Sequence, residues 1–151
     1  MARFSFRLQQ FLDVKEQLEE QKELVYAAAV RKREEERARL HALQDELQQQ
    51  LQALRLAVQN MLEPIDIRRY NHSIERLKQH IKLQEERLQA ATTYTEAKRL
   101  ELVEAMKERK ALEIVRDNAR EAHRQEENIA EMQQVDELVS FKYGQTRASH
   151  V

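Results

Sequence analysis

The side chains that most often carry chemistry in proteins are few and scattered in this sequence. It contains no cysteine and a single glycine, Gly144, so it offers neither a thiol nucleophile nor a glycine-rich loop that could cradle phosphate. No two histidines are four residues apart and none has a glutamate three residues before it, although helical metal sites use these spacings. The histidines are His41, His72, His80, His123 and His150. We therefore expect that the protein is not an enzyme and that it binds no metal, no other cofactor and no small-molecule substrate.

The composition is that of long helices rather than of a compact globule. Of the 151 residues 35% are charged and 5% aromatic, and there is one proline and no tryptophan, which is typical of a helical coiled coil. The formal net charge of -1 gives no general attraction to nucleic acid or to anionic lipid. No apolar run approaches the ~20 residues that cross a bilayer, and no secretory signal is recognisable. Together with the absence of cysteine, these features favour a cytoplasmic protein that binds no nucleic acid.

A single proline, Pro64, separates two stretches that share the same helical repeat. Apolar residues recur at Leu40, Leu47, Leu54 and Met61 before it and at Ile74, Ile81 and Leu88 after it, with further members between them. Spacings of three and four place such residues along one stripe of an α-helix, and this stripe must be buried. Proline disfavours helix in the residue before it but fits the first turn of a new helix. The sequence therefore predicts an all-α fold in which two long helices form an antiparallel coiled-coil hairpin over residues 1–144.

The hairpin can be divided further along the sequence. We expect helix one at about residues 3–62, the tip at about 62–68, helix two at about 67–143 and a disordered tail at 145–151. Gly144 would provide the left-handed cap that ends helix two. With the tip at the proline, the numbers of opposed residues add to roughly 130. This alignment places Leu51 opposite Gln79 and the polar residues 31–39 opposite residues 91–99.

The apolar stripe of helix one does not stay on one face of the helix. Near the N-terminus its members are Phe4, Leu8, Phe11, Leu18 and Val25, but from Leu40 on the stripe is out of step with them. Such a slip equals one additional four-residue step, which is the stutter that locally unwinds a left-handed coiled coil. We expect the intervening Arg- and Glu-rich residues to remain helical through exposed charge pairs.

The same alignment leaves helix two longer than helix one. Beyond about Ile129 no part of helix one remains to pair with it, although apolar residues continue as far as Phe141. Unpaired apolar surface on a soluble protein usually marks a binding site. We expect a binding surface at this end, and the alternative is a frayed end that packs on its own chain.

Three segments of the sequence resemble the FliJ family. They are FSFRLQQFLDVKEQLEE, RRYNHSIERLKQHI and KERKALEIVRDNAREAHRQEENIAEMQQVDEL. In that family a late Lys/Arg-Glu-Arg-Lys-x-Leu-Glu segment precedes a helix that closes on Asp-Glu, and here these are residues 107–113 and Asp136-Glu137. The resemblance implies a cytoplasmic component of the flagellar type III protein export apparatus, a two-helix coiled coil similar to the rotor stalk of rotary ATPases. It implies three partners, namely the flagellar export ATPase, an export-gate membrane protein and export chaperones, and a position at the inner face of the cell membrane at the flagellar base.

With these partners the two ends of the hairpin receive different roles. A ring-shaped ATPase accepts a stalk through a narrow opening, which suits the overhanging end, and the tip half is left for the export gate. The expected ATPase-binding residues are Phe4, Arg7, Phe11, Ile129, Met132, Val135, Leu138 and Phe141, with the apolar members providing the affinity. The expected gate-binding residues are Tyr70, Ser73, Leu77 and His80. Two alternatives are the stalk of a virulence-type III secretion system and a structural or tethering coiled coil that associates with itself.

Overall fold

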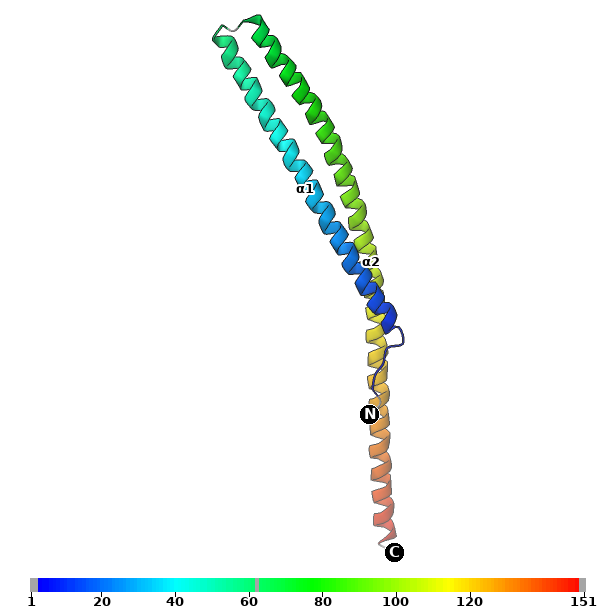
Figure 1. Ribbon diagram of the computed structural model, residues 1–151. Helices are drawn as coiled ribbons and strands as arrows, with labels where there is room; N and C mark the ends of the chain where they lie inside the picture. The colour runs from blue at the N-terminus through cyan, green and yellow to red at the C-terminus, as the bar shows by residue number, and fades with distance from the viewer. Residues whose placement is uncertain (1–2, 62, 150–151) are drawn as a thin grey trace. The chain divides into compact units, whose positions relative to one another are not determined.

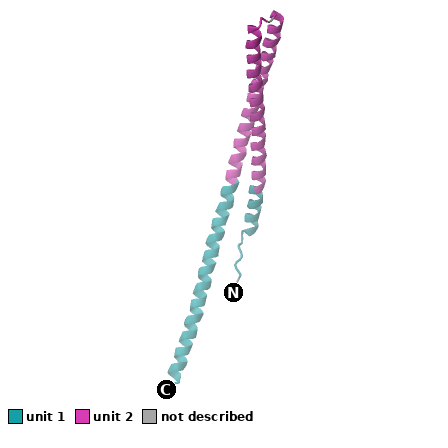
Figure 2. Cartoon of the chain, turned by 90° about the vertical axis from the view of Figure 1, so that its left-hand side faces the viewer, with its two compact units in different colours: residues 1–19, 105–151 teal, residues 20–104 magenta. Residues whose placement is uncertain are grey.

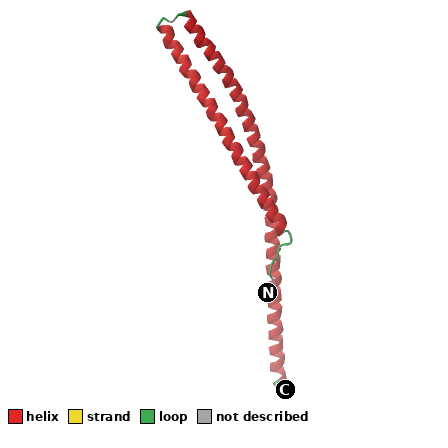
Figure 3. Ribbon diagram, viewed as in Figure 1, coloured by secondary structure: helices red, strands yellow, loops and turns green. Residues whose placement is uncertain are grey.

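The structure is a computed structural model that describes residues 3–61 and 63–149 and consists of two helices (Figures 1 and 3). Helix α1 is Gln9–Gln59, with 51 residues, and helix α2 is Pro64–Ala148, with 85 residues. No strand occurs in the described ranges, and the two helices pack against each other. The prediction of an all-α helical hairpin is therefore confirmed. Its physical basis is a sequence of strong helix formers interrupted by a single proline.

The turn that joins the helices lies before Pro64 rather than around it (Figure 1). Met61 adopts a left-handed backbone conformation, with a φ of 57°, which turns the chain out of α1. Pro64 is the first residue of α2, where a backbone N–H would have no helical acceptor and its absence carries no penalty. Residues 64–68, which the sequence assigns to the tip, are thus helical, and α1 ends at Gln59. Residue 62, the expected end of helix one, lies outside the described residues.

The chain divides into two compact units (Figure 2). The hairpin unit is Glu20–Glu104 and contains the turn with most of α1 and the first part of α2. The terminal unit is Met1–Glu19 with Ala105–Val151 and contains the beginning of α1 and the rest of α2. Each unit has its own contacts between the two helices, and each is described separately below.

Polar contacts between α1 and α2 define the register of the hairpin unit. The Ser73 hydroxyl donates a hydrogen bond to Oε1 of Gln50 at 2.8 Å, and the Thr95 hydroxyl donates one to the carbonyl oxygen of Ala29 at 3.1 Å. The residue numbers of these pairs add to 123 and 124. The two helices are therefore antiparallel in this unit, in one consistent register.

This register corrects the alignment predicted from the sequence. A total of roughly 130, with Leu51 opposite Gln79, is about six residues away from the observed one. The cause is the turn, whose middle lies about three residues earlier than that total requires because proline begins α2 instead of occupying the centre of the tip. Residues 31–39 accordingly face residues of about 84–93 rather than 91–99, and Glu36 lies against Gln84.

The face of α1 that packs on α2 follows an unbroken heptad repeat. In the hairpin unit its buried and half-buried positions include Lys22, Tyr26, Ala29, Arg33, Glu36, Leu40, Leu43, Leu47 and Gln50, spaced alternately by four and three. The predicted stutter is wrong, because α2 keeps an unbroken repeat and a step in one helix alone would put the two out of register. Leu24 and Val25 lie beside this face and are 72% and 40% exposed. The apolar stripe through Val25 is therefore not the stripe that α1 buries.

Two buried positions of the hairpin unit hold the polar residues Glu36 and Gln84. The Gln84 amide donates to the Glu36 carbonyl oxygen at 2.9 Å and also to its carboxylate. Lys32 and Arg39 lie within 3.0 Å and 3.4 Å of the same carboxylate. The hydrogen bond from Gln84, followed by that from Lys32, lowers the pKa of Glu36 below its usual value of 4.5. Polar layers of this kind lower stability but favour one register over its alternatives.

In the terminal unit α1 packs on α2 around Leu12, whose side chain is completely buried. One helical layer away, the Arg109 guanidinium of α2 pairs with Glu19 of α1 and lies 2.8 Å from Glu113 of its own helix. These hydrogen bonds, the one to Glu19 first, raise the pKa of Arg109. Apolar and charged layers thus alternate between the helices here as well.

Residues 3–8 precede α1 as a non-helical segment (Figure 3). The Phe4 ring packs on the His123 imidazole with 5.5 Å between the ring centroids, and the Arg120 guanidinium lies 5.6 Å from the Phe4 centroid. A helix starting at about residue 3 is therefore not observed. An extended chain advances about 3.3 Å per residue against 1.5 Å in a helix. This difference lets Phe4 reach a cationic and aromatic surface farther along α2.

Helix α2 passes through Gly144 without a cap and ends at Ala148. Gly144 does not have a positive φ, and a Cβ atom placed on it would have no neighbour within 4 Å. The glycine therefore neither ends the helix nor permits a close contact. Residues 145–148, which the sequence assigns to a disordered tail, are helical in the structure. Residues 150 and 151 lie outside the described part of the chain.

Candidate interaction surfaces

The largest exposed apolar surface of the terminal unit is the end of α2. Every residue in 128–149 is exposed, whereas Ala119 and His123 are half-buried. The apolar side chains in this range are 45% to 71% exposed, and they are Ile129, Met132, Val135, Leu138, Val139, Phe141 and Tyr143. Five of them were predicted as binding residues, and Val139 and Tyr143 are additional. Nothing else in the terminal unit exposes so many apolar side chains along one described helical segment.

These side chains lie on two faces of α2. Each residue turns an α-helix by about 100°, so residues nine apart, such as Met132 and Phe141, point in opposite directions. Five side chains share one face, which we call the outer stripe: Ile129, Met132, Val135, Val139 and Tyr143. Leu138 and Phe141 lie away from it and line a shallow depression together with Gln134 and Glu137. The single stripe predicted from Met132 to Phe141 is therefore divided between two faces, because steps of three alone drift around the helix.

The predicted N-terminal members of the ATPase-binding set are not joined to the outer stripe. Phe4 is half-buried against Arg120 and His123, which precede the stripe on α2. Arg7 is exposed in the segment before α1, and Phe11 is 63% exposed on α1. Phe11 was predicted from a stripe that α1 does not bury, which explains why its side chain remains accessible.

The four residues predicted to bind the export gate lie on the side of α2 that faces α1. Leu77 is only 7% exposed, and Ser73 is half-buried and hydrogen-bonded to Gln50. Tyr70 is half-buried, and His80 alone is exposed. Tyr70 and Leu77 belong to the α2 seam, and Ser73 and His80 each precede a seam residue by one position, which places them at the edge of the seam. A partner that approaches from outside can therefore reach His80 directly but Leu77 only at the bottom of a groove.

This groove contains residues of α1 that sequence reasoning missed. Its lining consists of Leu43, Glu46 and Gln50 from α1 with Ser73, Arg76, Leu77 and His80 from α2, around a volume of about 270 Å³. The sequence of α2 alone does not indicate which α1 residues line the groove. The predicted register would have placed other α1 residues opposite this part of α2. The correct register, with paired numbers near 123, would have identified them.

Within residues 3–61 and 63–149, no group of three or more histidine, aspartate or glutamate side chains is arranged to hold a metal ion. Neither helix has a described stretch that is both long and apolar enough to pass through a bilayer.

A family model described as Flagellar FliJ protein matches residues 4–148 of the chain. No curated protein and no solved structure matches. The matched range includes both helices, the groove and the outer stripe.

Proposed function

Because the chain belongs to the flagellar FliJ protein family, which makes it a component related to flagellar protein export, we propose that it is a non-catalytic stalk. In this role the end of α2 binds the flagellar export ATPase ring, the groove of the hairpin unit binds the export-gate membrane protein, and the protein assists delivery by export chaperones. It would act in the cytoplasm, held peripherally at the inner face of the cell membrane at the flagellar base. The proposal assigns no catalytic role to the chain itself.

The observation that carries this proposal is the exposed apolar end of α2. Residues 128–149 have no cover from α1, and they keep two apolar faces in contact with solvent. Exposed apolar faces of this extent on a helix favour binding to other proteins. A helix that is apolar on two opposite sides suits surroundings that enclose it, such as the opening of a ring, better than a single flat surface.

The groove of the hairpin unit supports the second contact. It combines an apolar floor at Leu77 with polar side chains at Gln50, Ser73 and His80. Small grooves with an apolar floor and a few polar groups at the rim give both affinity and orientation. We assign it to the export gate because the other exposed surface is already assigned to the ATPase.

The ATPase contact is tested by stimulation of the purified export ATPase by the full chain. We expect Val135→Ser combined with Leu138→Ser and Phe141→Ser to abolish stimulation, because it removes apolar side chains from both faces of the exposed end. The matched control is Leu24→Ser, an exposed apolar residue of the hairpin unit that is 72% accessible. Far-UV circular dichroism should show both variants as helical as the parent.

The outcome assigns the two ends. If the triple variant stimulates the ATPase normally and His80→Ala abolishes stimulation, the ATPase binds the groove and the proposed orientation is wrong. If the triple variant alone loses stimulation, the end of α2 is the ATPase contact. Binding of the soluble domain of the gate protein to His80→Ala, measured in the same preparations, tests the second contact.

A further inference from the structure

The face of α2 that packs on α1, and farther along on Phe4 of the segment before α1, can be followed by its heptad repeat to His123. Its buried and half-buried members in the terminal unit are Ala105, Arg109, Leu112, Arg116, Ala119 and His123, spaced alternately by four and three. Continued past His123, the same repeat falls on Glu126, Ala130, Gln133 and Glu137, which are small or polar. The face that α1 covers therefore ends in a surface that has little apolar area to bury.

The outer stripe follows the same repeat displaced by one residue. Ile129, Met132, Asp136, Val139 and Tyr143 each precede a position of the continued repeat by one, with Val135 beside Asp136. One residue corresponds to about 100° around the helix. The outer stripe is therefore displaced to one side of the line along which α1 packs, and that line itself continues over the small and polar residues named above. Alternating steps of three and four over two heptads are the surface into which another helix packs.

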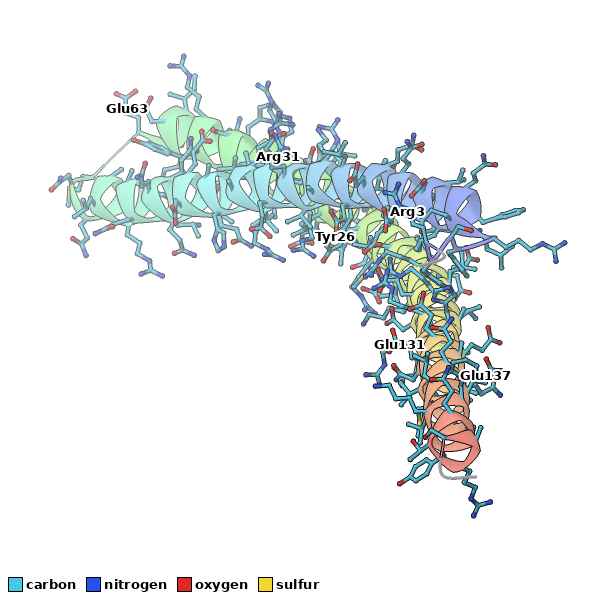
Figure 4. The ribbon with its side chains drawn as sticks, turned by 90° about the horizontal axis from the view of Figure 1, so that it is seen from below. Arg3, Tyr26, Arg31, Glu63, Glu131 and Glu137 are labelled. Carbon is cyan, nitrogen blue, oxygen red and sulfur yellow. The ribbon has the colours of Figure 1, made fainter. Side chains whose placement is uncertain are left out.

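The part of the outer stripe from Ile129 to Asp136 lies within a run of negative charge. Residues 126–137 contain five carboxylates and no lysine or arginine: Glu126, Glu127, Glu131, Asp136 and Glu137. Glu131 and Asp136 have no cationic side chain within 4 Å among the described residues of the protein. Figure 4 shows Glu131 and Glu137 extending from different sides of α2. A partner that covers the stripe must therefore bring positive charge, since leaving these carboxylates unpaired beside an apolar contact is costly.

We propose that the outer stripe is the docking site for a basic amphipathic helix of a partner protein. The apolar face of that helix packs on Met132, Val139 and Tyr143, and a lysine or arginine of the partner pairs with Asp136, which interrupts the stripe. The long stem of such a residue packs on apolar surface while its charge reaches the carboxylate. The inference rests on the proposed function in assigning this end of α2 to a partner protein, and it names the chemistry of the partner's contacting element.

A second copy of the chain fits this site poorly. Paired in parallel, two outer stripes would place Asp136 against Asp136 and Lys142 close to Arg147, which brings like charges together. Paired antiparallel, Lys142 and Arg147 would approach acidic residues, but both copies of Asp136 would still lie in neighbouring apolar layers at the centre. Two buried carboxylates without a cation oppose association in either direction.

The test uses the full chain and two synthetic helical peptides of three heptads, labelled for fluorescence anisotropy. In both peptides one core position and the flanking positions are charged, and the remaining core positions are leucine. The charged residue is lysine in one peptide and glutamate in the other. We expect the lysine peptide to bind the chain, and the glutamate peptide to bind at least about tenfold more weakly. Met132→Ser with Val139→Ser should weaken binding of the lysine peptide by at least about tenfold. The control Leu138→Ser with Phe141→Ser lies on the other face and should change binding less than about twofold.

Asp136→Lys provides a second variant that leaves the apolar side chains in place. It should weaken the lysine peptide and strengthen the glutamate peptide, because the charge of the central layer is inverted. The inference is overturned if the chain prefers neither peptide, if both serine double variants weaken binding equally, or if sedimentation equilibrium shows a dimer of the parent that Met132→Ser with Val139→Ser abolishes. Peptide binding requires no ATPase, so failure of the inference with ATPase stimulation intact is separate from failure of the proposed function.

Discussion

The register of the hairpin unit can be tested by a single cross-link. The hydroxyl of Thr95 lies 3.1 Å from the carbonyl oxygen of Ala29, and both residues are almost completely buried. A threonine side chain is short, so this contact requires a close approach of the two helix backbones, and a disulfide needs Cα atoms less than about 7 Å apart. We expect Ala29→Cys with Thr95→Cys to form a disulfide within one chain. The protein has no cysteine of its own to compete.

The size of the effect follows from the separation of the two residues. Ala29 and Thr95 are 66 residues apart in the sequence. In the chain-entropy description, closing a loop of that length restricts the unfolded chain by about 4 kcal/mol at 25 °C. For a chain of this size that corresponds to a rise in melting temperature of roughly 10 °C. Because the oxidised and reduced forms of one variant are compared, the loss of the Thr95 hydroxyl affects both and cancels.

Two measurements decide the result. Non-reducing gel electrophoresis separates a cross-link within one chain from one between chains, and circular dichroism with and without reductant gives the change in melting temperature. The matched control is Leu51→Cys with Gln79→Cys, the pair that a register total near 130 would oppose. In the observed register Gln79 lies about six residues, or ~9 Å along the helix, from the residue opposite Leu51. Efficient cross-linking of the control pair with none at Ala29 and Thr95, or cross-links only between chains, would refute the register.

Three further results are expected. Glu36→Gln should make stability depend less on pH in the acid range. The folded pKa of Glu36 lies below 4.5, so its carboxylate stabilises the protein above pH 4.5 and this contribution is lost as the pH falls through the folded pKa. Melting temperatures of the parent and the variant from pH 7 to pH 3 measure the difference. Leu12→Ala should lower the free energy of unfolding by about 2–4 kcal/mol in urea titrations, whereas Leu24→Ala, at an exposed position, should change it little. Amide exchange should be faster in residues 128–149, which have no tertiary cover, than in residues 70–105.

The sequence was sufficient to predict two long helices and the place where the chain turns back. Both follow from local features, the repeat of three and four and the single proline, which act within a few residues of where they stand. It was not sufficient to predict the register, because a heptad repeat allows pairing in steps of one heptad with little change in apolar burial. The observed register depends on the turn at Met61 and on pairs such as Ser73 with Gln50, which form only after the helices have met.

The candidate surfaces were predicted unevenly for the same reason. The exposed end of α2 requires only that helix two be longer than helix one, and five of its seven apolar residues were identified on that basis. Leu77 was predicted as a surface residue and lies at the floor of a groove, since its position depends on what α1 places opposite it. Residues on an unpartnered segment can therefore be read from periodicity, whereas residues near a helix interface require the register first.

The displacement of the outer stripe shows how these two kinds of information combine. Ile129, Met132, Val139 and Tyr143 are visible in the sequence as a repeat of three and four, and read alone they look like the end of the stripe that binds α1. Only the seam observed up to His123 reveals that they stand one residue out of step with it. If the end of α2 were only a frayed extension of the hairpin, nothing would require its apolar residues to change face. An apolar surface without a partner lowers solubility on whichever face of the helix it lies. The repeat changes face beyond His123, where neither α1 nor the segment before it covers α2, and this change suits a second, different helical partner.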